Sequence, residues 1–183
     1  GPVSPLEQVD RDRKGGAGWA GGYRVPCILR PPGTIPASQE RGAIASKLDF
    51  LPTFAAMTGA ALPESLELDG KDLTRVIFEG AASPHEAIVL FDNAKVAAVR
   101  TQDWKYVVRS YFRTFDIPLG RFNYPLLFDI RRDPGENYSV ASLHPEVAAE
   151  MKTRVETARA FYEPMTKLFP AYVRPQAAAW HPD

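Results

Sequence analysis

The chain has 183 residues, of which 45% are hydrophobic and 24% are charged, as in ordinary globular proteins. Its 22 Lys and Arg residues balance its 22 Asp and Glu residues, so no net charge favours nucleic acid or a membrane surface as a partner. The single cysteine excludes an internal disulfide framework, and no run approaches ~18 apolar residues, so the sequence predicts no transmembrane segment. The 17 prolines, about twice the average share, indicate a chain rich in turns.

A glycine-rich segment and a short apolar run stand near the N-terminus. Residues 14–22, KGGAGWAGG, place Lys14 ahead of five glycines. Glycine lets the backbone approach a ligand closely, and a lysine ammonium suits an anionic oxygen, although a solvated loop lysine is the alternative. Residues 23–30, YRVPCILR, predict a buried strand in which Cys27 is a packed core thiol. Because so apolar a strand usually has neighbours on both sides, this part resembles the edge of a larger sheet.

Two helical segments are predicted next. Residues 47–59 form the first, with Asp49 as its N-cap and Gly59 at its C-terminal end. The spacing of apolar residues predicts a buried face made of Leu51, Phe54, Ala55 and Thr58. Residues 66–80 predict a turn followed by a short helix that ends at Gly80.

The second half predicts an antiparallel sheet. Apolar or alternating runs at 86–92, 95–101 and 104–110 indicate a meander, and 126–130 a fourth strand. Residues 112–125 are expected to be a surface loop. The WKY sequence at 104–106 is interpreted as strand alternation and not as a platform for nucleic acid.

A long helix is predicted to follow the sheet, beginning near Pro145 and Glu146. Its apolar stripe consists of Val147, Ala148, Met151, Val155, Ala158, Phe161 and Tyr162. From Pro164 onward the sequence predicts an extended, proline-rich tail.

The remaining titratable residues have modest expected roles. The three histidines are predicted to be capping, surface or tail residues: His85, His144 and His181. Asp129, Asp133 and Glu136 could be arranged around a metal ion, but the Asp-Pro-Gly-Glu sequence favours a structural turn. Arg24 is expected to anchor the glycine-rich segment structurally.

Several segments, taken in order, resemble the type I (formylglycine-dependent) sulfatases, arylsulfatase-like members of the alkaline-phosphatase-like superfamily. The matching sequences are KGGAGWAGGYRVPCILRPPGTIPAS, KLDFLPTFAAMTGAALPE, LDGKDLTRVI, VRTQDWKYV and LLFDIRRDPGENYSVASLHPEVAAEM. The resemblance extends from about residue 14 to residue 162 and implies an α/β fold. It assigns residues 1–82 to the end of the catalytic α/β domain. Residues 83–163 become a small subdomain of about four antiparallel strands packed on a C-terminal helix, and 164–183 a tail.

The resemblance implies a sulfuric ester hydrolase that acts on a sulfate-ester small molecule or a sugar sulfate. In the family, a cysteine in a Cys-x-Pro-x-Arg motif becomes formylglycine, whose hydrate attacks sulfur. A calcium ion and fixed cations hold the sulfate, because charge grows on its oxygens during the reaction. Lys14 is the position that matches the family's sulfate-contacting lysine. Members are usually periplasmic, secreted or lysosomal.

The sequence departs from the family pattern in its catalytic parts. It has no Cys-x-Pro-x-Arg motif and no acidic cluster like the calcium site, Ala20 replaces a common acidic residue, and one extra residue separates Lys14 from Trp19. We therefore expect formylglycine, the Ca²⁺ ligands and an N-terminal sulfatase domain to lie outside this chain, which is expected to be inactive alone. Gly1-Pro2 fits either the end of the family's Asp-Asn-Gly-Pro segment or a remnant of tag removal.

Two other functions remain open. Phosphonate monoester and phosphodiester hydrolases of the same superfamily share these segments, and a non-catalytic module could bind a partner through its sheet edge. Arg121 and Tyr124, with Phe115 and Phe122, are candidates for substrate or partner contact in the 112–125 loop. The sulfatase-fragment interpretation predicts exposed apolar residues at 23–30 and 48–58 and self-association, whereas an independent module predicts a clean monomer.

Overall fold

The computed structural model of the chain describes residues 18–30, 33–35, 38–92, 95–112, 115–117 and 126–166. The chain divides into two compact units, one of residues 25–88 and one that combines residues 1–24 with residues 89–183. Among the described residues, no helix combines the length and apolar character needed to span a membrane. The elements are α2 (Ala20–Tyr23), the 3₁₀ helix η1 (Lys47–Asp49), α3 (Phe50–Thr58), α4 (Thr74–Glu79), β1 (Ile88–Asp92), β2 (Lys95–Arg100), β3 (Trp104–Val107), β4 (Ser110–Phe112), β5 (Phe115–Ile117), β6 (Leu126–Asp129) and α5 (Pro145–Thr166).

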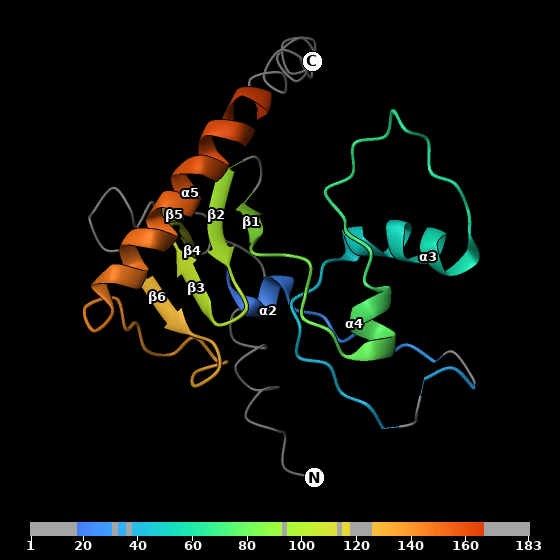
Figure 1. Cartoon of the computed structure of the whole chain (residues 1–183). Helices are drawn as coiled ribbons and strands as arrows, with labels where there is room; N and C mark the ends of the chain where they lie inside the picture. The colour runs from blue at the N-terminus through green and yellow to red at the C-terminus, as the bar shows by residue number, and fades with distance from the viewer. Residues whose placement is uncertain are drawn as a thin grey trace, which may run out of the picture. The chain divides into compact units, whose positions relative to one another are not determined.

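The larger unit contains a four-stranded antiparallel sheet in the order β1-β2-β3-β6 (Figure 1). Tyr106 on β3 stands opposite Val99 on β2 and Leu127 on β6. Helix α5 lies along β2 and β3 and buries Met151, Val155 and Ala158. The predicted four strands and C-terminal helix are therefore confirmed.

Two details of this unit differ from the sequence prediction. Residues 110–112 and 115–117 pair as a two-stranded hairpin, where a loop was expected at 112–125. Helix α5 continues through Pro164 to Thr166. A proline near the end of a helix removes only one backbone donor, so the helix need not stop before it.

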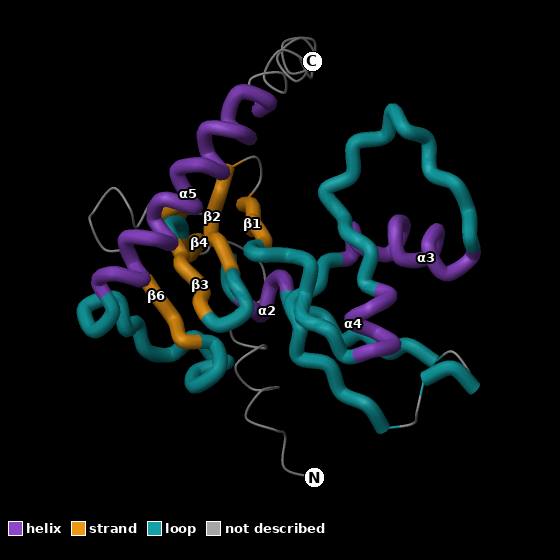
Figure 2. Tube along the Cα trace, in the orientation of Figure 1, coloured by secondary structure: helices purple, strands orange, loops and turns teal. Residues whose placement is uncertain are grey.

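The smaller unit consists of η1, α3, α4 and long connecting loops (Figure 2). The predicted helix ends are confirmed: Gly59 and Gly80 both adopt left-handed conformations, with φ of 70° and 71°. The predicted buried face of α3 is confirmed at Ala55, which is 8% exposed, but was wrong at Leu51 and Phe54, which are each 50% exposed. Thr53 is buried instead, where its hydroxyl oxygen accepts a hydrogen bond from the backbone N–H of Leu73 at 3.0 Å.

Asp49 organises the loops of this unit. Its carboxylate accepts hydrogen bonds from the backbone N–H groups of Ser46 (2.6 Å) and Lys71 (2.8 Å) and lies 2.7 Å from Nε2 of His85. Gly70 permits this approach, since a Cβ there would lie 2.0 Å from the carbonyl oxygen of Leu48. The His85 side chain is only 8% exposed, so the expected capping or surface role was wrong. Sequence spacing gave no sign of a partner 36 residues away.

The predicted strand at 23–30 was also wrong. Tyr23 ends α2, and residues 24–30 belong to no regular element. None of the described strands pairs with this segment, and an isolated strand has no partner for its backbone groups. Ile28 is 91% exposed and Cys27, expected in a core, is also exposed. The prediction of exposed apolar residues is confirmed, and the large ones within 23–30 and 48–58 are Tyr23, Val25, Ile28, Leu29, Leu48, Phe50, Leu51, Phe54 and Met57.

Replacing Asp49 with Ala should destabilise the smaller unit, because three hydrogen-bond donors lose their acceptor. We expect a loss of at least about 2 kcal/mol in the local opening free energy, since each buried unsatisfied group costs about 1–3 kcal/mol. Hydrogen exchange of peptides from residues 44–85 measures this loss. The exposed Asp69→Ala is the control, and equal effects of the two substitutions would contradict the role given to Asp49.

Candidate functional site

The glycine-rich segment meets the sheet at Gly18, four residues after Lys14. Gly18 is buried and has a φ of +78°, a conformation that side chains of L-residues rarely adopt. A Cβ at this position would lie 2.9 Å from the Cβ of Ala98 on β2. The absence of a side chain therefore lets the segment lie directly on the strand.

Trp19 makes the next contact. Its ring packs against Phe128 on β6, with the ring centroids 5.7 Å apart and the planes at 56°. Phe128 belongs to a buried cluster with Ala98, Val107 and Ile130. The segment thus shares the hydrophobic core of the sheet unit.

Ala20 makes the third contact through its backbone. Its N–H donates a hydrogen bond to Oε2 of Glu136 at 3.0 Å, and Oε1 of Glu136 accepts one from Nζ of Lys105. The side chains of Lys105 and Glu136 are each 1% exposed. Lys105 lies on β3 opposite Phe128. We call Lys105, Glu136 and the Ala20 N–H the anchor.

The turn after β6 delivers Glu136 to this position. Asp129 accepts hydrogen bonds from the N–H groups of Arg131 and Arg132. Asp133 accepts from the backbone N–H groups of Asn137 (2.6 Å) and Tyr138 (2.8 Å). Both carboxylates therefore build the turn, as the Asp-Pro-Gly-Glu sequence predicted.

Burial and neighbouring charges both change the pKa values of Arg100 and Tyr23. Burial lowers the pKa of the Arg100 guanidinium, and the negative charge of Glu136 opposes that change. Burial, followed by the nearby Asp92 carboxylate, raises the pKa of Tyr23 at the end of α2. The anchor carboxylate therefore pairs with Lys105 and also acts on the Arg100 guanidinium through its negative charge.

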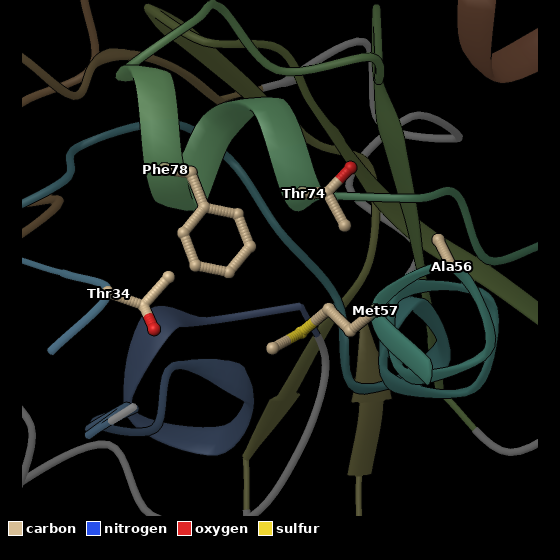
Figure 3. Close-up of a pocket in the computed structure, with 5 residues that line it drawn as sticks. All are labelled: Thr34, Ala56, Met57, Thr74 and Phe78. Carbon is tan, nitrogen blue, oxygen red and sulfur yellow. The ribbon is translucent and has the colours of Figure 1, made fainter. Parts of the chain in front are cut away.

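The described residues do not fit the family's metal or nucleophile. Within the part of the chain that the structure describes, no three His, Cys, Asp or Glu residues gather in a way that could hold a metal ion. Cys27 is exposed and lacks the Cys-x-Pro-x-Arg context. An open pocket of about 420 Å³ in the smaller unit is lined by Thr34, Ala56, Met57, Thr74 and Phe78, with the Met57 and Phe78 side chains extending into it (Figure 3). No charged side chain lines this pocket, so it does not suit a sulfate ion.

The residues predicted to contact substrate lie outside the described part: Lys14, Arg121 and Tyr124. Their roles remain predictions. His144 is partly exposed and packs against Trp104, with the ring centroids 5.0 Å apart and the planes at 58°, beside Glu146 in the first turn of α5.

Sequence reasoning missed the anchor. Lys105 was taken as part of an alternating strand, but it is buried, because Glu136 supplies its opposite charge from the turn. The available signal was a lysine inside the apolar run WKYVV together with a glutamate immediately after Asp-Pro-Gly.

Gly18→Ala tests how closely the segment is held on β2. The substitution combines an unfavourable φ with a contact 2.9 Å from Ala98, so we expect roughly 1–3 kcal/mol of destabilisation. Urea unfolding followed by Trp fluorescence measures it. Gly42→Ala is the control, because a Cβ there meets no atom within 4 Å and its φ is unexceptional. An unchanged free energy of unfolding in Gly18→Ala would show that the segment is not held closely against β2.

Comparison with known proteins identifies a family that has this sheet and covering helix. The family model of the C-terminal region of aryl-sulfatase matches residues 83–180. The arylsulfatase of Hemicentrotus pulcherrimus is 30% identical over 167 residues, which are 78% of this chain and 30% of that protein. The chain thus spans about a third of the length of this relative.

Solved structures show the same fold. A sulfatase from Pseudoalteromonas sp. superposes with a TM-score of 0.60 at 20% identity, covering 70% of this chain and 28% of its own. A protein solved with its substrate D-glucosamine-2-N,6-O-disulfate gives a TM-score of 0.53 at 21% identity, covering 75% and 28%. The sheet with its covering helix, the matched family region and the relatives agree: this chain belongs to the sulfatase family and corresponds to the C-terminal region of its members.

Proposed function

We propose that the chain is the C-terminal part of a sulfuric ester hydrolase of the arylsulfatase type and is inactive by itself. The observation that carries the proposal is the fixed position of Gly18, Trp19 and Ala20 on the sheet, beginning four residues after Lys14, which matches the family's sulfate contact. During sulfate-ester cleavage, negative charge grows on the sulfuryl oxygens, and a fixed cation stabilises that charge. Lys14 supplies the cation.

The nucleophile and the calcium ion belong to chain outside these residues. The described residues offer no cluster suited to a metal, and the sequence has no formylglycine motif. This chain therefore contributes Lys14, which binds the sulfate, and the contacts that hold the segment after it. The formylglycine hydrate that attacks sulfur comes from chain outside these residues.

A sugar sulfate is the substrate class that we favour over other sulfate esters. The structural neighbour solved with a disulfated glucosamine shares the fold of this chain, which supports a sugar sulfate as the first substrate to test. A phosphonate monoester or phosphodiester is the second candidate, since lysine binds oxygens on sulfur and on phosphorus alike.

Lys14→Ala in the full-length gene product tests this function. Sequencing the DNA 5′ of codon 1 identifies the upstream domain that must be included. We expect kcat/KM for an aryl sulfate to fall by about 10²–10³, as when one fixed group that stabilises the developing charge is removed. Lys14→Arg should keep part of the activity and the neighbouring Arg13→Ala most of it. Unchanged activity in Lys14→Ala would overturn the role given to Lys14, and a clear preference for aryl phosphonate would overturn the assignment to sulfate esters.

The 183-residue chain alone should self-associate. Its exposed apolar residues, among them Ile28, Leu48 and Leu51, are side chains that water solvates poorly. Multi-angle light scattering should give a mass that rises with concentration, and Leu48→Glu/Leu51→Glu should reduce the rise. A clean monomer at all concentrations would favour an independent binding module.

A further inference from the structure

We infer that Lys105 and Glu136 are positioning residues for the sulfate-contacting segment: through the Ala20 N–H they hold the end of the loop that carries Lys14. The inference rests on the proposed function and assigns a role to two residues that touch no substrate.

The two oxygens of the Glu136 carboxylate accept hydrogen bonds from two different donors. One oxygen accepts from Lys105 on β3, and the other accepts from the Ala20 N–H at 3.0 Å. The Ala20 N–H is the first of α2, where no intrahelical acceptor exists. No side chain of the N-cap residue Trp19 satisfies it, so the acceptor comes from a residue 116 positions away.

The ion pair is not needed to stabilise the sheet itself. Replacing a buried ion pair with apolar side chains of similar size is often neutral or stabilising, because both charges lose their hydration on burial. An apolar pair at positions 105 and 136 would therefore fill the same space. What it could not supply is an acceptor for the Ala20 N–H.

The backbone of Glu136 supports the same conclusion. Its φ is +56°, a conformation that glycine adopts with less strain. Glycine at this position would relieve the strain but would remove the carboxylate. Lys105 pairs with that carboxylate and orients it inside the protein.

The anchor acts together with two further contacts on the same segment. Gly18 lies against Ala98, and Trp19 packs on Phe128, so three consecutive residues are fixed immediately after the lysine loop. A displacement of about 1 Å in a group that stabilises a transition state can cost about 10²-fold in rate. The three contacts therefore limit the displacement of residues 18–20, the first of the structure's described residues after Lys14 in the sequence.

Two matched double variants separate the ion pair from the acceptor. Lys105→Met/Glu136→Met removes both charges and the acceptor, whereas Lys105→Met/Glu136→Gln removes both charges and retains an amide oxygen for the Ala20 N–H. In the 183-residue chain, we expect hydrogen exchange at Gly22 and Arg24, which belong to or cap α2, to accelerate roughly tenfold in the Met/Met variant. The Met/Gln variant should exchange much as the original chain does.

Ala20→Pro provides a third variant that leaves the ion pair intact. Proline removes the N–H donor and suits the first position of a helix. Trp19 already has the extended φ and ψ of −77° and 149° that a residue before proline prefers. This variant should accelerate exchange at Gly22 and Arg24 as the Met/Met variant does, and it gives the answer if a double variant fails to fold.

Kinetics of the full-length enzyme test the connection to Lys14. The Met/Met variant should lower kcat/KM for an aryl sulfate roughly tenfold relative to Met/Gln, and this difference should vanish in a Lys14→Ala background, since coupled residues are non-additive. Equal hydrogen exchange in the two double variants, or a kinetic difference that persists without Lys14, overturns the inference. If Lys14→Ala alone leaves activity unchanged, the role proposed for Lys14 fails, and an exchange difference would then show only a structural anchor.

Discussion

The buried pair of Lys105 and Glu136 holds together three parts of the larger unit: strand β3, the turn after β6 and the segment that enters through Gly18. Neither charge can remain in the protein interior alone, since leaving one partner buried and unpaired costs about 3–5 kcal/mol. Removing one partner alone would therefore leave the other as a buried charge without its counterion. The Glu136 carboxylate joins the three parts because its two oxygens accept from β3 and from the segment that follows Gly18.

The smaller unit uses the same device with a different carboxylate. Asp49 is fully buried and gathers the backbone of Ser46 and Lys71 and the ring of His85. A region with few helices and no complete sheet has many backbone donors that regular structure does not satisfy. One buried carboxylate, with acceptor capacity on both oxygens, can satisfy several of them. In both units, a buried acidic side chain thus accepts backbone hydrogen bonds that neighbouring strands would accept in a sheet.

Sequence periodicity was sufficient for elements that pair with their neighbours along the chain. The alternating runs near Val99 and Tyr106 and the stripe containing Met151 and Val155 are short-range signals, and the structure contains those strands and that helix. Periodicity failed at residues 24–30 and on one face of α3, where the apolar side chains of Ile28, Leu51 and Phe54 are exposed. It also missed Lys105 and His85, because each is buried by a carboxylate 31 or 36 residues away, a distance that residue spacing does not encode.

These contacts indicate which part of catalysis this chain performs in the proposed enzyme. The sulfatase family region in this chain holds a segment in place, but its described residues offer no cluster that could bind a metal. A cation stabilises a transition state only if its position is set before the charge develops, because moving it into place during the reaction would cost reorganisation energy. Glu136 fixes the segment at Ala20 by accepting a hydrogen bond from its backbone N–H. Apolar replacement of a buried ion pair often leaves stability unchanged, but here it would remove that acceptor. Catalytic efficiency and fold stability can therefore vary separately at this site, and a sequence change that keeps the sheet folded can still lower the rate.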